Sequence, residues 1–192
     1  MHNTTVCALL FVLFVIPSRA ASQQEPAPTG KTFTLLGQML DGYKETQRNL
    51  AEAAEKMPEE HYGFRPTPDI RPFGQLVAHV ALSQFGTCAA LSGEPNPKKD
   101  EEEDATRTKT DAIALLEASA EYCDPPVNTL TEQTMTELTK VGDNQAAKGL
   151  LPVSLVTHGM QTYATMAVYL RLKGIVPPTT ERQNQEMKKK GQ

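Results

Sequence analysis

Two histidines stand on apolar helical stripes, where an imidazole can hold a metal ion, exchange protons or simply pack in the core. His79 lies three residues after Leu76, and His158 shares a helical face with Leu155 and Met166. Residues three and four apart lie on one face of a helix, so both imidazoles are expected to point inward. Taken one at a time, histidines in such surroundings are more typical of hydrogen-bonded core residues than of ligands.

The cysteines are the other residues with reactive side chains. Cys88 and Cys123 lie on apolar stripes near the ends of two predicted helices, and Cys7 lies in an apolar N-terminal run. Cys7 would be removed with this run if the run is a secretory signal, as argued below, and Cys88 and Cys123 would remain. We predict a disulfide between them, because an even pair of cysteines in an exported protein is compatible with one. The alternative is two buried free thiols that behave as small apolar residues. The sequence has no GxSxG nucleophile motif and no GxxxxGK phosphate loop.

The composition is that of a soluble globular protein of one domain. The chain has 192 residues, of which 39% are hydrophobic and 22% are charged. It contains 19 Lys and Arg against 23 Asp and Glu, and the formal net charge is −4. A mildly acidic chain lacks the basic surface that nucleic-acid binding requires, so we expect no nucleic-acid partner.

The N-terminus has the pattern of a secretory signal. Its apolar run, Val6 to Ile16, is shorter than the roughly 20 residues that span a bilayer. We therefore predict a signal peptide over residues 1–20, with cleavage after Ala20 or Ser22, and a flexible leader over 21–31. The mature protein is expected in the periplasm or outside the cell, with no stable membrane span after cleavage. The alternative is an uncleaved membrane anchor.

The remaining chain reads as all-α, with four amphipathic helices and no convincing strand. Apolar residues at alternating spacings of three and four predict helices over 32–57, 72–92, 108–122 and 151–173. The polar stretch over 127–148 has one short helix near 131–138, and a disordered tail covers 179–192. Four such helices predict a four-helix bundle over 32–178, and the long connections allow crossovers.

Two stretches resemble a known family. They are FRPTPDIRPFGQLVAHVALSQ (64–84) and HGMQTYATMAVYLRLKGIVPP (158–178), supported by KMPEEHYGFRP (56–66). They resemble the DinB-like superfamily, close to its exported bacterial branch, and the resemblance extends over most of residues 32–180. It implies a bundle of up-down-down-up topology. Many members bind a divalent metal, and the superfamily includes thiol-dependent transferases and isomerases and metal-dependent hydrolases.

The resemblance also implies a site. The family's metal is held by three histidines, one from the second helix and two from the fourth, spaced i, i+4. His79 matches the first position and His158 the second, whereas Thr162 occupies the third. The expected metal is one divalent ion, zinc or nickel, and a threonine hydroxyl is a poor ligand for either. Two of the three ligands therefore remain, and the site is expected to be partly degenerate.

Three functions follow as hypotheses. The first is an exported protein that binds a small molecule or a partner and whose metal site is weakened or lost. The alternative is a metal-dependent hydrolase or transferase that uses His79 and His158. The third is a structural or interaction protein. The sequence does not decide whether the chain is an enzyme, which ligand it binds or whether it forms a homodimer.

Overall fold

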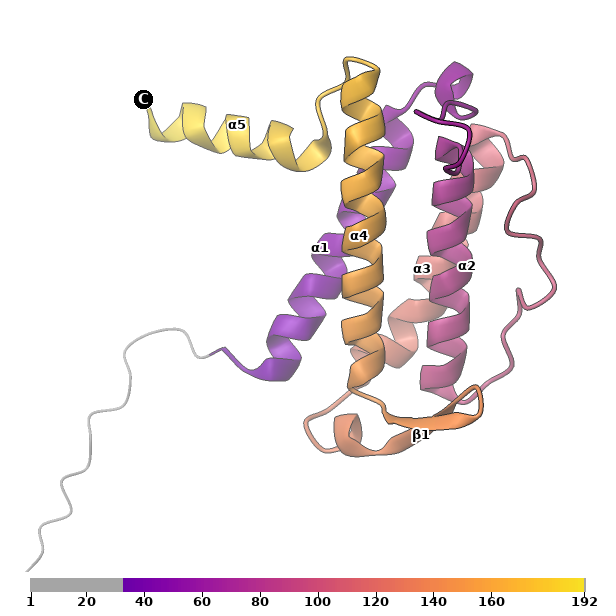
Figure 1. Ribbon diagram of the computed structural model, residues 1–192. Coiled ribbons are helices and arrows are strands. Elements are labelled where there is room, and N and C mark those ends of the chain that lie inside the picture. The colour runs from indigo at the N-terminus through magenta and orange to yellow at the C-terminus, as the bar shows by residue number, and fades with distance from the viewer. Residues whose placement is uncertain (1–32, 192) are drawn as a thin grey trace, which may run out of the picture. The chain divides into compact units, whose positions relative to one another are not determined.

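The computed structural model describes residues 33–191, so the expected signal peptide and leader lie outside the described residues. Five α-helices, two short 3-10 helices and one hairpin make up the described part (Figure 1). The helices are α1 (Leu35–Lys56), α2 (Phe73–Ser92), α3 (Lys109–Asn128), α4 (Leu150–Leu172) and α5 (Pro178–Lys190); the 3-10 helices are η1 (Glu59–His61) and η2 (Thr134–Thr136); the strands are β1 (Leu138–Val141) and β2 (Asn144–Ala147). No helix among residues 33–191 is long and apolar enough to cross a bilayer.

Two threonine caps set where α1 and α3 begin. The Thr34 hydroxyl accepts a hydrogen bond from the Gly37 amide at 3.0 Å. The Thr108 hydroxyl accepts one from the Asp111 amide at 3.1 Å and donates one to the Asp111 carboxylate at 2.7 Å. These bonds satisfy amides that have no partner within the first turn of a helix. Thr108 followed by Asp111 three residues later resembles a capping box in the sequence, and these two bonds confirm it.

The four long helices run up, down, down and up, as the family resemblance implies. Lys109 at the start of α3 donates to the Glu55 carbonyl near the end of α1 at 2.6 Å. Tyr169 near the end of α4 donates to the Arg71 carbonyl just before α2 at 2.7 Å. The ends of α1 and α4 therefore lie with the starts of α2 and α3. The connection over 93–108 runs back along the bundle, so that α2 and α3 are parallel (Figure 1).

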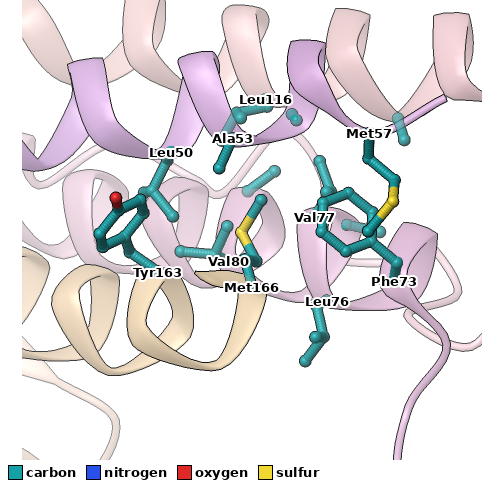
Figure 2. Packing of buried hydrophobic residues seen from close by; sticks show 14 of the residues in the cluster. Leu50, Ala53, Met57, Phe73, Leu76, Val77, Val80, Leu116, Tyr163 and Met166 are labelled. Atoms are coloured by element: carbon teal, nitrogen blue, oxygen red, sulfur yellow. The ribbon is translucent and has the colours of Figure 1, made fainter. Parts of the chain in front are cut away.

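Side chains from all four long helices form the main core (Figure 2). Leu50 of α1, Phe73 of α2 and Met166 of α4 are fully buried within it. Burial of this apolar surface is the main driving force for folding. The backbone of α4 comes close to α1 at Gly159, where an added Cβ would lie 2.4 Å from the Thr46 methyl group. This close packing fixes the position of the preceding residue, His158, relative to α1.

The structure corrects the predicted end of the third helix. The sequence predicts a stop at Asp124-Pro125-Pro126, but α3 continues to Asn128. The apolar stripe that includes Cys123 goes on to Val127, which is fully buried. Proline keeps a helical φ, but it lacks the amide hydrogen bond and its ring crowds the carbonyl four residues before it. Burial of Val127 outweighs this cost in the last turn.

The polar stretch over 127–148 also differs from the prediction. The short helix predicted near 131–138 is present as η2, a 3-10 helix of three residues. It is followed by an antiparallel hairpin that was not predicted, in which Leu138 pairs with Ala147. The hairpin turns at Gly142-Asp143, and Gly142 has a φ of 59°. Glycine in this left-handed region suits a two-residue hairpin turn. The sequence shows this turn only as a Gly-Asp pair within a polar stretch.

The tail from residue 179 is helical rather than disordered. Pro178 begins α5, a position that its fixed φ favours. Arg182 then contacts Glu45, Glu52 and Asn49 of α1. These tertiary contacts, which the sequence does not show, order the first turns of a segment that is otherwise polar.

Cys88 and Cys123 form a disulfide, with their Cα atoms 5.3 Å apart. Both residues are fully buried, one near the end of α2 and the other in α3. The pairing predicted from the sequence is confirmed. The bond joins the two parallel helices in a second apolar cluster that also contains Tyr43, Leu91 and Leu155.

Candidate functional site

The fold brings His79 of α2 and His158 of α4 into contact. Their ring centroids are 4.9 Å apart and the rings are inclined at 75°. Both side chains are partly buried, between the two helices. The sequence places the two imidazoles on inward faces, and the tertiary structure joins them into one site.

A third group, Glu103, completes the site from the loop between α2 and α3. Its carboxylate lies 2.9 Å from Nδ1 of His79 and also pairs with Arg71. Burial alone would raise the pKa of Glu103, but the charges and hydrogen bonds of His79 and Arg71 outweigh it, so the pKa is lowered. A carboxylate at Nδ1 favours the tautomer in which that nitrogen is protonated and Nε2 is free to accept.

His158 is the unsatisfied member of the pair. Its Nε2 atom is buried and has no hydrogen-bond partner among residues 33–191. Burial lowers the pKa of His158, and the nearby His79 and Arg71 lower it further against an opposing effect of Glu103. The ring is therefore neutral at pH 7. A neutral ring with an unpartnered buried nitrogen costs stability unless another molecule supplies the partner.

Thr162 stands where the family resemblance implies a third histidine. It is 6% exposed, and its hydroxyl donates to the His158 carbonyl at 3.0 Å. Within residues 33–191 no group of three or more His, Cys, Asp or Glu side chains is arranged to hold a metal ion. Glu103 does not change this, because the carboxylate oxygen that faces His79 already pairs with both His79 and Arg71. The residues present therefore do not fit a tightly held metal ion.

An open cleft lies near the start of α2, and Arg71 is the site residue that lines it. Its volume is about 480 Å³, and its lining includes Arg71, Leu76 and Thr165. Leu76 lies one helical turn before His79, and Thr165 two turns after His158. Arg71 connects the cleft to the histidines through Glu103. Arg71 thus links the histidine pair and Glu103 to a cleft that is large enough for a small organic molecule.

Comparison with models of known protein families shows which family this chain belongs to. A sequence model described as the DinB superfamily matches residues 43–165, a range that includes α2, α3, both histidines and Thr162. The chain belongs to the DinB superfamily. The resemblance inferred from residues 64–84 and 158–178 is confirmed, as is the all-α fold.

Solved structures agree with this DinB fold. A DinB-like protein from Bacillus cereus is 10% identical, with a TM-score of 0.61 over 73% of this chain and 93% of its own. A DinB-like protein from Bacillus subtilis is 20% identical, with a TM-score of 0.57 over 71% and 92%. A conserved protein from Enterococcus faecalis is 15% identical, with a TM-score of 0.55 over 73% and 98%. No curated protein matches this chain.

Glu103 is the site residue that the sequence does not reveal. It lies in a run of acidic residues over 100–104, which is expected to form an exposed loop, and it belongs to no helical stripe. The feature of the sequence that points to this loop is the length of the connection after α2. His61, by contrast, lies in η1, apart from the helices that carry the pair.

The depressed pKa of His158 predicts a loss of stability in mild acid. An unfolded histidine titrates near 6.5, and the folded pKa is lower. The stability due to neutral His158 is therefore complete above about pH 6.5 and is lost as the pH falls toward the folded pKa. Urea unfolding at pH 7.5 and 5.5 should show a smaller decrease for His158→Gln than for the wild type. A His61→Gln control should behave as the wild type, and equal decreases in all three would contradict the assignment.

Proposed function

We propose that this DinB-superfamily protein binds a small molecule in the cleft beside His79 and His158, and that the pair binds divalent metal only weakly. The observation that carries the proposal is the buried Nε2 atom of His158, which has no partner among residues 33–191. Leaving a buried polar atom without a hydrogen bond costs about 1–3 kcal/mol. A ligand that enters from the cleft at Arg71 and extends to this nitrogen would remove that cost.

The donor set supports a binding site rather than a resident metal centre. The site offers two imidazoles, while Thr162 is a neutral alcohol that already donates to the backbone. Tight zinc sites use three or four strong ligands. A neutral His158, a fixed His79 and the Glu103–Arg71 pair instead offer hydrogen-bonding groups of both kinds, and Arg71 connects them to a cleft that Leu76 and Tyr169 also line.

Metal content tests the first half of the proposal. The mature protein, purified without an affinity tag or a chelator, should hold less than about 0.2 equivalents of zinc, nickel or other divalent metal, because tight sites need more ligands. Adding zinc should leave the thermal stability nearly unchanged. One equivalent of metal, lost in both His79→Ala and His158→Ala but retained in His61→Ala, would overturn the proposal in favour of a metal-dependent hydrolase or transferase.

Imidazole nitrogen signals test the second half. Phenol serves as the probe, because it has one hydrogen-bonding group on a small apolar ring. Phenol should shift the Nε2 resonance of His158, and His158→Ala should abolish saturable phenol binding while His61→Ala retains it. Phenol that binds equally well to His158→Ala, or that leaves the His158 resonance unmoved, would contradict the site.

We also propose that the protein acts outside the cytoplasm. The apolar run over 6–16 and the small residues at the predicted cleavage site support export. The Cys88–Cys123 disulfide is consistent with it, since such bonds persist in oxidising compartments. Export would also separate the protein from the thiol pool of the cytoplasm.

A further inference from the structure

The cleft beside the histidines continues into a second hollow along α4. The two hollows share Ile70, Thr165 and Tyr169, and the second has a volume of about 460 Å³. Together they form one groove between the segment over 66–71 and the outer face of α4. The polar end of this groove lies at Arg71 and Asp104, and its far end lies at Leu172.

The far end of the groove is apolar and exposed. Ile70 is 40% exposed, Val168 51% and Leu172 56%, and all three line the second hollow. Contiguous apolar surface of this kind commonly marks a binding site. The ligand that this end accepts therefore carries a hydrocarbon part.

The polar end holds two carboxylates without partners. Asp69 and Asp104 both line the first cleft. Neither carboxylate makes a hydrogen bond or an ion pair with the rest of residues 33–191. Among these described residues the only cation in the lining is Arg71, which is paired with Glu103. Arg65 donates to the Pro68 carbonyl beside Asp69 and is a second nearby cation. Asp69, Asp104 and Glu103 still outnumber Arg71 and Arg65, so the charge at this end is negative and favours a cationic group.

We propose that the groove binds an amphiphilic ammonium ion, a primary alkylamine whose head lies at Asp69 and Asp104 and whose chain lies along Val168 and Leu172. The inference rests on the proposed function and names the ligand class of that cleft. The helix from Thr165 to Leu172 rises about 10 Å. An extended chain of roughly eight carbons has a similar length, so it can reach from the polar end to the far end.

Calorimetry with octylammonium chloride, below its micellar concentration, tests the charge and the chain together. One equivalent should bind, at least tenfold more tightly than octanoate, which has a chain of equal length, or ethylammonium, which has an equal charge. From butylammonium to octylammonium the affinity should rise about three- to fourfold per methylene, corresponding to about 0.8 kcal/mol for each buried CH₂. The proposal would be overturned if octylammonium did not bind, or if octanoate or ethylammonium bound with equal affinity.

Substitutions at exposed positions locate the site without threatening the fold. The double variant Asp69→Asn/Asp104→Asn should bind octylammonium at least fivefold more weakly. Val168→Asn should flatten the dependence on chain length while leaving ethylammonium unaffected. The matched control is Asp143→Asn, which removes an exposed aspartate in the hairpin turn and should change nothing. An Asp143→Asn variant that loses as much affinity as the double variant would show attraction by net charge alone and would overturn the assignment.

This test is separate from that of the proposed function. The metal measurement and the phenol titration involve no amine, and they report on the histidines directly. Failure of every alkylamine to bind, with phenol still shifting His158, would refute the ligand class and leave the proposed function in place.

Discussion

Replacing Thr162 with histidine should raise the affinity for zinc at least tenfold. Residues 158 and 162 lie one turn apart on α4, and Thr162 is buried beside the histidine pair. An imidazole at this position would supply a strong third ligand in place of a neutral hydroxyl. Calorimetric titration of the wild type and of Thr162→His with zinc measures the difference in affinity.

Two comparisons make this gain specific. Thr157→His places a histidine at an exposed position of the same helix, away from the face that residues 158 and 162 share, and should leave the zinc affinity near that of the wild type. The triple variant Thr162→His/His79→Ala/His158→Ala should lose the gain entirely. An unchanged affinity in Thr162→His would mean that the register of α4 against α2, or the correspondence with the family's third ligand, is wrong.

Removing the disulfide should produce the largest loss of stability. The bond closes a loop with a sequence separation of 35 residues. In the chain-entropy model such a closure stabilises the fold by about 3–4 kcal/mol, because it restricts the unfolded chain. The double variant Cys88→Ala/Cys123→Ala should lose about this amount in urea unfolding at pH 7.5. Replacing both residues avoids a free buried thiol.

The histidine site should not respond to this change. The bond joins α2 to α3 in the second apolar cluster, whereas the pair lies between α2 and α4. The imidazole signals and zinc affinity of the double variant should match those of the wild type. Two alkylatable thiols in the denatured, non-reduced protein, or unfolding energies that differ by less than about 1 kcal/mol, would contradict a stabilising bridge.

Much of the bundle could be read from the sequence, because its helices are encoded locally. Apolar spacing predicts the four long helices, and Thr108 with Asp111 predicts the start of α3. Ser92-Gly93 followed by Pro95 is a stop signal, and Gly93 ends α2 with a left-handed φ of 80°. The resemblance to the family's motifs identifies His79, His158 and Thr162 as the three site positions on two of these helices. The apolar stripes of α2 and α3 also carried both cysteines, so the disulfide was a consistent expectation.

Where local signals conflict, packing prevailed. The two prolines in α3 argue for an end, yet burial of Val127 carries the helix past them. The polar tail after residue 178 has no core pattern of its own, and contacts of Arg182 with α1 order its start. Neither outcome could be read locally, because the deciding partners lie elsewhere in the chain.

The chemistry of the site divides in the same way. The residue types on the inner faces of α2 and α4 are predictable from the sequence, because helical periodicity fixes which side chains share a face. Only the tertiary structure joined Glu103 and Arg71 to His79, left the Nε2 atom of His158 without a partner among residues 33–191, and set two unpaired aspartates at one end of an apolar groove. These features depend on how loops cross the bundle, and loop paths follow long-range contacts that no local pattern encodes.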